Sequence, residues 1–392
     1  MSEPLFQMQS FPNGSFITME GTRKGDFFHI IMDGQVVLRT KNPASGEDAT
    51  QYLGKGDFFG VITAMSGFPH LETATSSGTV SVISVHRDKF ADLIRRNTPL
   101  AMKIIRSYSL RLRQLDTMQY EQKYRDEDSI ESAMKLADGT LEVGNKELAA
   151  YMYQSILETH PEGEHRAKCL AKLNYLNKPT ERTVKTSSAR TYDKNDIIFC
   201  EGEPGKELFI VQAGRVKIFK YVGGHEVVLN VMKDGDIFGE MALIDNKPRF
   251  ASAVSQELTN VITISKANFA NITETNPQLM ARVISLLSER VWTSYKKSVN
   301  SKITESNYRF ADLLLILAEQ AKVRIAPRSG YNYKISPEDF LRMQGMGDTE
   351  MPNLLRFIKS HNFLSTEGST IICSDLALLE RAVKGFKDRY NK

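Results

Sequence analysis

Two charged side chains, Glu240 and Arg249, lie nine positions apart in the segment FGEMALIDNKPRFASA at residues 238–253. A guanidinium presents a planar fork of donors that suits an oxyanion such as a phosphodiester, and an ionised carboxylate, which only accepts hydrogen bonds, suits a hydroxyl group. Gly239 allows the backbone to approach a ligand closely. The apolar residues 241–243 are expected to form a helical turn whose free N–H groups face the anion. The segment therefore predicts a site for a small anionic ligand that also carries a hydroxyl group.

A second segment of the same type lies earlier in the chain. FGVITAMSGFPHLETA at residues 59–74 aligns with residues 238–253 without a gap, at an offset of 179 positions. The register extends upstream, where GDFF at Gly56 matches GDIF at Gly235. Because a fixed internal period identifies a repeated structural unit, we expect two copies of one domain, over roughly residues 10–115 and 185–300.

Both copies have the pattern of antiparallel β-structure. Segments that alternate between apolar and polar residues, such as residues 36–39 and 216–219, indicate half-buried strands. Glycines recur at turn positions about every 8–12 residues, which is typical of an antiparallel barrel or jelly roll. Each copy then changes to a helical period, over residues 90–115 and 269–299. The fold class predicted for the whole chain is therefore α+β and multidomain.

The segment at residues 238–253 resembles the phosphate-binding cassette of the cyclic nucleotide-binding domain, and residues 185–300 are similar to that fold. The resemblance implies that Arg249 binds the phosphate of a cyclic nucleotide and that Glu240 binds its ribose 2′-hydroxyl. The nucleotide would be a ligand, and no further cofactor is implied. The predicted ligand-binding residues are Gly239, Glu240, Met241, Ala242, Arg249, Phe250, Ser252, Thr293 and Ser294.

Phe250 departs from the family, in which the residue after the arginine is commonly small or hydroxylic. Its side chain offers no donor or acceptor to a phosphate or to a guanine, although its backbone N–H remains available. The substitution favours cAMP over cGMP as the ligand.

The helix that follows the second copy has two predicted roles. The residues at heptad-like steps, which indicate a seam for another helix, are Met280, Leu287, Val291, Ser294 and Ser298. By resemblance to catabolite-activator-type regulators, this helix pairs two subunits in a homodimer and places Thr293 and Ser294 against the base. The alternative is a helix that only packs against its own chain.

The first copy lacks both charged residues, because Val61 and His70 occupy the positions of Glu240 and Arg249. Valine cannot bind a ribose hydroxyl, and a neutral histidine is a poor replacement for a permanent cation. Glu72 adds a negative charge close to the expected phosphate position. The first copy is therefore expected to be a structural or dimerising domain without nucleotide, and the alternative is that it binds a different ligand.

Residues 116–184, between the two copies, are expected to form a helical spacer. They contain charged amphipathic stretches and apolar residues at helical spacing, interrupted at residues 161–163. Ala149, Tyr153 and Pro161 resemble the second half of a tetratricopeptide repeat. Such repeats stabilise one another in arrays of about three. A helical spacer packed on its neighbours is therefore the favoured interpretation, and a tetratricopeptide-like unit is the alternative.

Residues 301–392 predict a helix, a turn, a second helix and a hairpin. Ser336 and Asp339 form an N-cap pattern, and a glycine-containing break at residues 345–347 precedes a helix over about residues 349–361. A short hairpin follows. This order, and its place after a nucleotide-binding domain and a long helix, resembles the winged helix-turn-helix of the Crp/Fnr family of transcription regulators.

The resemblance assigns a set of candidate DNA-binding residues, namely Thr349, Asn353, Arg356 and Lys359. Arginine to guanine is the commonest specific base contact, and no arginine stands at the start of the second helix. Asp348 and Glu350 there repel phosphates instead, and residues 301–392 have only 14 basic against 11 acidic side chains. Since phosphate contacts supply most non-specific affinity, we expect modest DNA binding, with a domain adapted to protein contacts as the alternative.

Composition excludes several other classes of protein. The chain has 392 residues, of which 41% are hydrophobic and 25% charged, with a net charge of +4, which excludes a disordered or disulfide-stapled chain. Its three scattered cysteines indicate a reducing compartment and form no metal-ligand cluster. The sequence has no signal pattern and no apolar run long enough to span a bilayer. We therefore expect a cytoplasmic protein without membrane attachment.

The leading hypothesis is a cyclic-nucleotide-responsive transcription regulator that binds cAMP in its second copy. Its domains are expected at residues 1–115, 116–184, 185–300 and 301–392. The alternative is a cyclic-nucleotide-binding signalling protein that acts on a protein partner. Enzyme function has little support, because the seven histidines form no ligand-spaced cluster and no nucleophile motif is present.

Overall fold

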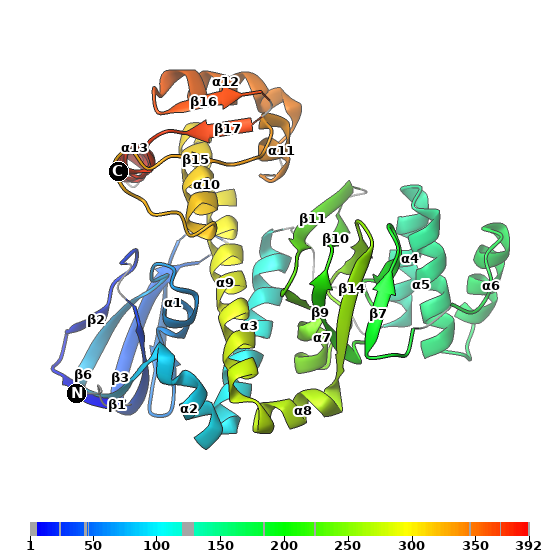
Figure 1. The fold of residues 1–392 in the computed structure, drawn as a ribbon, viewed down its shortest axis with the longest axis horizontal. Helices are drawn as coiled ribbons and strands as arrows, with labels where there is room; N and C mark the ends of the chain where they lie inside the picture. The colour runs from blue at the N-terminus through cyan, green and yellow to red at the C-terminus, as the bar shows by residue number, and fades with distance from the viewer. Residues whose placement is uncertain are drawn as a thin grey trace. The chain divides into compact units, whose positions relative to one another are not determined.

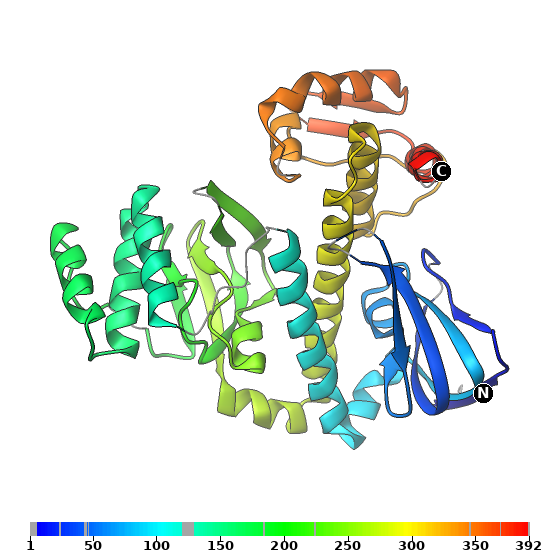
Figure 2. The same cartoon turned by 180° about the vertical axis from the view of Figure 1, so that it is seen from behind.

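The computed structural model describes most of the chain. The described residues are 6–22, 25–42, 45, 47–119, 129–182, 185–222, 225–344, 346–368 and 370–390. They form two compact units, of which one contains residues 1–90 and 287–392 and the other contains residues 91–286. Figures 1 and 2 show the elements of both units from opposite sides.

The strands of the first copy form one antiparallel sheet of six strands, in the first unit (Figure 1). They are β1 (Phe6–Phe11), β2 (Phe16–Thr18), β3 (Phe27–Lys41), β4 (Asp48–Leu53), β5 (Phe58–Phe59) and β6 (Thr73–His86). The order is β1-β6-β3-β4, with β2 paired to β6 and β5 paired to β3. A short helix, α1 (Val61–Ser66), lies between β5 and β6 in the chain.

The strands of the second copy form two antiparallel sheets of four strands in the second unit, with orders β11-β10-β13-β8 and β12-β9-β14-β7. They are β7 (Ala189–Tyr192), β8 (Ile197–Phe199), β9 (Glu207–Ala213), β10 (Val216–Val222), β11 (His225–Met232), β12 (Ile237–Phe238), β13 (Ser252–Ser255) and β14 (Thr259–Ser265). The prediction of two antiparallel β domains is confirmed. A closed barrel is not found among the described strands, so the barrel prediction is not confirmed.

The two copies repeat the same local structure around their cassette helices. In the second copy this helix is α7 (Glu240–Asp245), and like α1 it begins directly after a left-handed glycine. The φ angles are 77° at Gly60 and 74° at Gly239, in a region that only glycine adopts without strain. The stacked ring pairs beside the helices are His29–Phe59, at 4.9 Å between centroids, and Phe209–Phe238, at 5.1 Å. The alignment made from the sequence therefore corresponds to a real structural repeat.

Each helical region predicted after a copy consists of two helices rather than one. They are α2 (Phe90–Arg96) and α3 (Thr98–Gln119) after the first copy, and α8 (Lys266–Thr275) and α9 (Pro277–Ser301) after the second. An asparagine interrupts each pair and caps the second helix: Asn97 Oδ1 accepts from the Leu100 N–H at 3.3 Å, and Asn276 Oδ1 accepts from the Leu279 N–H at 3.0 Å. Proline in the first turn favours a helix start at these points.

Three helices lie in the described part of the spacer, namely α4 (Ile130–Glu142), α5 (Lys146–Thr159) and α6 (His165–Tyr175). Ser129 and Asn145 cap α4 and α5 through their side chains. The apolar faces of these helices share a buried cluster with Cys200 and Phe219 of the second copy. These helices therefore pack on the second copy.

The described residues of the C-terminal part form four helices and a small sheet. In chain order they are α10 (Ser306–Gln320), β15 (Tyr331–Asn332), α11 (Pro337–Arg342), a 3-10 turn (Asp348–Glu350), α12 (Met351–Ser360), β16 (Leu364–Glu367), β17 (Thr370–Cys373) and α13 (Leu376–Tyr390). The antiparallel sheet has the order β15-β17-β16. Ser336 Oγ accepts from the Asp339 N–H at 3.0 Å, which confirms the predicted N-cap.

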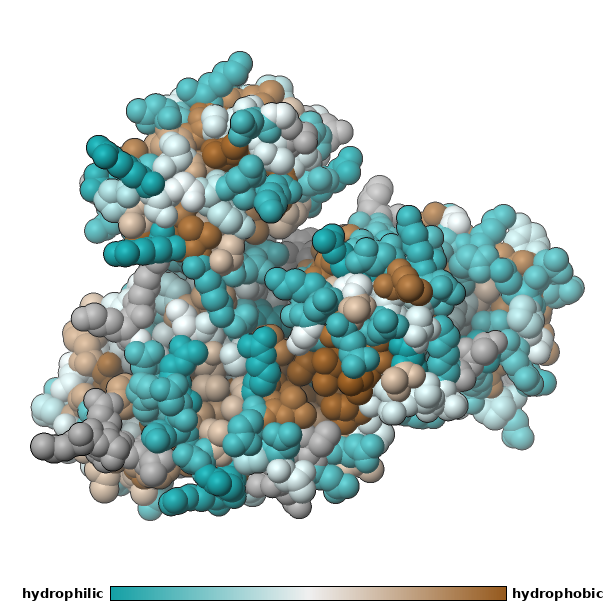
Figure 3. Space-filling view, viewed as in Figure 1, coloured by the Kyte–Doolittle hydropathy of each residue, from teal (hydrophilic) through white to brown (hydrophobic). Residues whose placement is uncertain are grey.

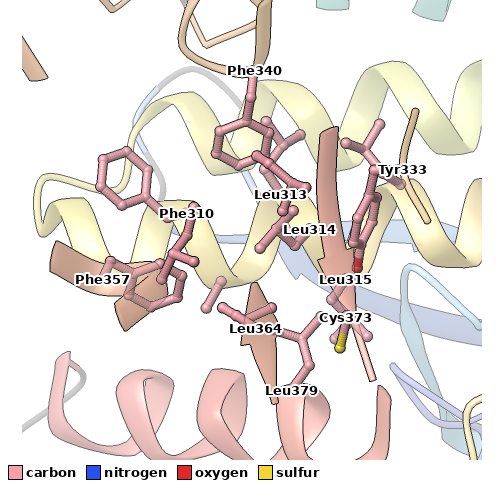
Figure 4. Close-up of a cluster of buried hydrophobic side chains, with 14 of the residues drawn as sticks. Phe310, Leu313, Leu314, Leu315, Tyr333, Phe340, Phe357, Leu364, Cys373 and Leu379 are labelled. Atoms are coloured by element: carbon pink, nitrogen blue, oxygen red, sulfur yellow. The ribbon is translucent and has the colours of Figure 1, made fainter. Parts of the chain in front are cut away.

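The start of α12 explains the proline at position 352, which is unusual within a helix. The helix begins at Met351, after the 3-10 turn, so Pro352 lies in the first turn, where a missing N–H has no intrahelical acceptor to lose. The predicted start near residue 349 was therefore two residues early. The helix buries Phe357 against the Phe310 ring of α10, which also contacts Phe340 of α11. Figure 4 shows Phe310, Phe340 and Phe357 within this cluster.

The surface of the molecule is mostly hydrophilic in the view of Figure 3, with apolar residues gathered in smaller areas. None of the helices in the described part of the chain is long and apolar enough to cross a bilayer. Cys169, Cys200 and Cys373 are buried and free.

Replacing Phe357 by alanine should destabilise the C-terminal helices, because its side chain is 2% exposed and its removal leaves a cavity. The expected loss is about 3–5 kcal/mol. Amide hydrogen exchange over residues 306–390 of the whole chain measures it. Leu355→Ala is the matched control on the same helix, since Leu355 is 37% exposed and its loss should change stability by less than about 0.5 kcal/mol. Equal exchange in the two variants would contradict the packing described here.

Candidate functional site

Glu240 and Arg249 are both buried in the second copy. Glu240 is the first residue of α7 and is 1% exposed, whereas Arg249 is 5% exposed and lies between α7 and β13 in the chain. The Arg249 guanidinium donates through Nη1 to the Gly239 carbonyl at 2.5 Å and through Nη2 to the Glu207 carbonyl at 2.8 Å. The structure therefore brings the two predicted anchors to one end of the cassette helix.

Aromatic rings and carboxylates surround the Arg249 guanidinium. Its Cζ atom lies 4.2 Å from the centroid of Phe199 and 5.5 Å from that of Phe209. Burial lowers the pKa of Arg249 below its ordinary value, although nearby carboxylates, Glu203 first among them, act in the opposite direction. Among the described residues its Nε atom has no hydrogen-bond partner. A buried cation that donates only to neutral carbonyls is costly, so an anionic ligand would stabilise it.

The backbone around Arg249 is held in place by a loop that precedes β9. The Arg249 N–H donates to the Glu203 carbonyl at 2.7 Å, and the Arg249 carbonyl accepts from the Gly202 N–H at 2.9 Å. Gly239 must be glycine, because an added Cβ would lie 2.7 Å from Arg249 Nη1. Gly205 leaves similarly little space, since a Cβ there would lie 2.3 Å from that of Ala242. Close backbone packing therefore fixes the position of the guanidinium.

Two of the carboxylates that act on Arg249 each have another cation as a partner. The nitrogen–oxygen distances are 3.0 Å for Arg182–Glu203 and 2.5 Å for Arg190–Glu207. These pairs limit the competition of the carboxylates for the Arg249 guanidinium. The arrangement leaves this guanidinium as the group that suits a phosphate.

Phe250 lies in the core of the second copy, and two cations approach its ring. Its side chain is 9% exposed, Lys220 Nζ lies 3.8 Å from the ring centroid, and Arg113 Cζ lies 5.9 Å from it. The sequence analysis missed both cations. Lys220 had a signal, because Val216, Ile218 and Lys220 alternate along one strand and the first two are buried in that core. Arg113 had none, since it comes from α3, a helix that follows the first copy.

The remaining predicted ligand residues lie in different surroundings. Met241 and Ala242, on α7, are 5% and 3% exposed. Ser252 is buried, and its hydroxyl accepts from the Glu201 N–H at 2.9 Å, so it holds the neighbouring loop. Thr293 and Ser294 lie on the part of α9 that belongs to the other unit, where the Thr293 hydroxyl donates to the Glu289 carbonyl at 2.9 Å. Direct contact of these residues with a ligand stays a prediction.

The first copy keeps the backbone of the site without its charges. The His70 N–H donates to the Thr22 carbonyl at 3.0 Å, and the His70 carbonyl accepts from the Gly21 N–H at 2.8 Å, as Arg249 does with its own loop. Val61, the first residue of α1, is 2% exposed, and His70 is 6% exposed. An apolar side chain and an imidazole therefore occupy the places of Glu240 and Arg249. The absence of nucleotide from this copy stays a prediction.

A second histidine lies beside this altered position. The His29 ring stacks on Phe59, and His29 Nδ1 lies 2.9 Å from Ser84 Oγ. Burial, and then the nearby charge of His70, lowers the pKa of His29 from 6.5 to about 4. His29 is therefore neutral in the folded protein at neutral pH.

The predicted helix seam is mostly buried. Its exposed fractions are 0% for Met280, 4% for Leu287, 0% for Val291 and 0% for Ser298, and Ser294 is half-buried. Pairing of two subunits through this seam stays a prediction.

The candidate DNA-binding residues lie at the surface of the C-terminal helices. Asn353, Arg356 and Lys359 are exposed on α12, and Thr349 is exposed on the preceding 3-10 turn. The Glu350 carboxylate accepts from Asn353 Nδ2 at 3.0 Å. One predicted base contact is therefore bonded to an acidic side chain at the start of the helix. The described residues contain no group of three or more acidic, histidine or cysteine side chains suited to a metal ion.

His29 should make the stability of the first copy depend on pH. The unfolded chain, with a His29 pKa of 6.5, binds more protons than the folded chain, with a value of about 4. The contribution of neutral His29 to the free energy of unfolding is therefore complete above pH 6.5. It is lost as the pH falls towards 4, by about 3 kcal/mol in all.

Urea unfolding followed by the fluorescence of Trp292, the single tryptophan, measures this dependence in the unit that contains the first copy. His29→Phe, which copies Phe209 of the second copy, should flatten it. His160→Phe changes an exposed spacer histidine and should leave it unaltered. The same pH dependence in His29→Phe and in the unmodified chain would refute this assignment.

The cyclic nucleotide-binding domain family matches the chain twice, at residues 8–97 and at residues 189–276. These ranges include both cassettes, although only the second has Glu240 and Arg249. The family match therefore confirms the repeat of one domain, and the residues distinguish the two copies.

Several characterised proteins are similar to about half of the chain. The CRP-like cAMP-activated global transcriptional regulator of Mycobacterium tuberculosis is 23% identical over 194 residues, which are 49% of this chain and 87% of that protein. The cyclic AMP receptor protein of Thermus thermophilus is 25% identical over 197 residues, which are 50% of this chain and 88% of that protein. Among solved structures, a CooA mutant from Carboxydothermus hydrogenoformans is 19% identical and covers 50% of this chain and 87% of its own, with a TM-score of 0.41. Two segments of the chain thus match the cyclic nucleotide-binding domain, and the distant similarity to the two curated CRP-like proteins supports the Crp/Fnr family.

Proposed function

We propose that the chain is a cyclic-nucleotide-responsive transcription regulator that binds cAMP in its second copy. One observation carries this proposal: the second copy buries Glu240 and Arg249 at the start of its cassette helix, whereas the first copy has Val61 and His70 at the same places. The names of the similar CRP-like proteins, which describe cAMP-activated regulators, support the same function.

The buried residues of the second copy suit the parts of a cyclic nucleotide. The Arg249 guanidinium would bind the phosphodiester, for which its Nε atom and its remaining Nη protons are donors. The Glu240 carboxylate would accept from the ribose 2′-hydroxyl. The Phe250 side chain has no donor or acceptor for a guanine, which favours adenine over guanine. The ligand would acquire most of its affinity from charge-assisted hydrogen bonds inside a desolvated site.

Binding in the second copy would act on the C-terminal helices through α9. This helix follows the second copy directly and ends at Ser301, five residues before α10 begins. A ligand shifts an equilibrium between two conformations only by its difference in affinity for them. The proposed role of the nucleotide is to favour one arrangement of α9 and the C-terminal part.

The C-terminal part would be a winged helix-turn-helix in which α12 enters the major groove and the β16–β17 hairpin is the wing. Arg356 and Lys359 are exposed on α12 and suit phosphates or base edges. The acidic Glu350 at the start of α12 favours a second candidate, in which this face binds a protein instead. We propose DNA as the main target, reached in the cytoplasm, and binding rather than catalysis as the mode of action.

Calorimetric titration with cAMP should give one site per chain. Arg249→Gln removes the charge that binds the phosphate and should weaken cAMP at least tenfold, since a hydrogen bond to a charged group contributes about 1.5–3 kcal/mol. His70→Gln is the matched control, because His70 occupies the equivalent position in the first copy. The affinity of this variant for cAMP should be unchanged. Two sites per chain, or a larger effect of His70→Gln than of Arg249→Gln, would overturn the assignment.

Binding to genomic DNA fragments should depend on Arg356 and on salt. Arg356→Ala should weaken DNA binding by the cAMP-bound protein. It should also reduce the steepness with which log affinity for DNA falls with log salt concentration by about one. Leu355→Ala, next to it on the exposed face of α12, controls for the helix itself. A gel-shift assay that starts at low salt measures the affinity for DNA and its dependence on salt. No binding to any fragment with nucleotide present would favour the protein-partner function.

A further inference from the structure

Each compact unit combines the strands of one copy with a helix that follows the other copy. In the second unit, α3 contacts α7 and α8 of the second copy, although α3 follows the strands of the first copy. In the first unit, the part of α9 from residue 287 onwards contacts the first copy, although α9 follows the strands of the second. The contacts that hold these helices are specific.

Arg113 attaches α3 to the cassette of the second copy. Its side chain is 6% exposed, and Nη2 donates to the Pro248 carbonyl at 2.8 Å. Its Cζ atom lies 5.9 Å from the ring centroid of Phe250. The guanidinium therefore contacts the residues on both sides of Arg249.

Trp292 attaches α9 to the cassette of the first copy. Its side chain is 1% exposed, Nε1 donates to the Pro69 carbonyl at 2.9 Å, and its ring lies 4.6 Å from that of Phe68. One turn further, the Tyr295 hydroxyl lies 2.6 Å from Thr40 Oγ1. The helix of the second copy is thus fixed to the residue that precedes His70.

These two attachments are equivalent under the repeat. Arg113 and Trp292 differ by 179 positions, and so do Pro69 and Pro248. Both helices also bury the same set of positions. In α3 these are Ala101, Ile104, Ile105, Tyr108, Ser109 and Leu112, and in α9 they are Met280, Val283, Ile284, Leu287, Ser288 and Val291. A helix from each copy therefore reaches the same proline carbonyl of the other copy.

We propose that the two copies exchange their C-terminal helices within one chain, so that the first copy is the internal dimerisation partner of the second. The exchange then takes place inside a single chain and needs no second chain. This assigns a role to the first copy, which lacks both charged anchors. It supplies α3 to the cassette of the second copy, and its own cassette contacts α9. Neither contact requires a nucleotide.

Cross-linking of isotopically mixed protein tests this proposal. We would replace Arg113 and Pro248 by cysteine in one variant, and Thr40 and Tyr295 by cysteine in a second. Each is prepared in light and in ¹⁵N-labelled form. The two forms are mixed under denaturing conditions, refolded together and treated without nucleotide with a short bismaleimide, and the cross-linked peptides are identified by mass spectrometry. The three natural cysteines are buried.

The proposal predicts cross-links in both variants that join light to light and heavy to heavy peptides only. Gln114→Cys combined with Pro248→Cys is the matched control, because the exposed Gln114 is the neighbour of Arg113 on another face of α3, and it should cross-link at least tenfold less. Light-to-heavy cross-links would show exchange between two chains and would overturn the proposal. So would the absence of cross-links in both variants when light scattering and circular dichroism show folded protein.

The result does not depend on the proposed function, since no ligand is added. If the chain fails to bind cAMP in calorimetry and still gives only unmixed cross-links, the helix exchange is supported and the nucleotide site is contradicted. If mixed cross-links accompany normal cAMP binding, the nucleotide site is supported and the helix exchange is contradicted.

Discussion

The second copy depends on a guanidinium that is buried without a dedicated anion. Arg249 donates to the carbonyls of Gly239 and Glu207 and lies against Phe199. Desolvation of a cation is costly unless it is paired, and neutral carbonyls compensate for only part of that cost. The cassette therefore holds a buried positive charge at the start of α7, and this charge is the electrostatic basis of the proposed phosphate site.

The comparison of the two copies separates the scaffold from the chemistry. Both have a left-handed glycine before the cassette helix and the same pair of backbone hydrogen bonds around residue 70 or 249. At these cassette positions the side chains differ, so the first copy retains the local backbone structure and loses the charge. A domain in which an imidazole replaces a guanidinium has no reason to bind a phosphate strongly, but it can still present a surface to a helix, as it does to Trp292.

The sequence was sufficient to find the repeat, the antiparallel β-structure and the two buried charges, because each rests on a local pattern. It also placed the cap at Ser336, since Ser336 Oγ binds a backbone N–H three residues away. It did not find the breaks at Asn97 and Asn276, whose capping bonds compete with continuous helical periodicity. The roles of Arg113 and Lys220 depend on which elements pack together. That is decided by tertiary structure and not by spacing along the chain.

A crystal structure of the whole chain grown with cAMP tests the central claim most directly. The account predicts one nucleotide per chain, with its phosphate at the Arg249 guanidinium, its ribose 2′-hydroxyl at the Glu240 carboxylate and no nucleotide beside His70. A nucleotide bound beside His70, or a second copy that remains empty at saturating cAMP, would contradict it.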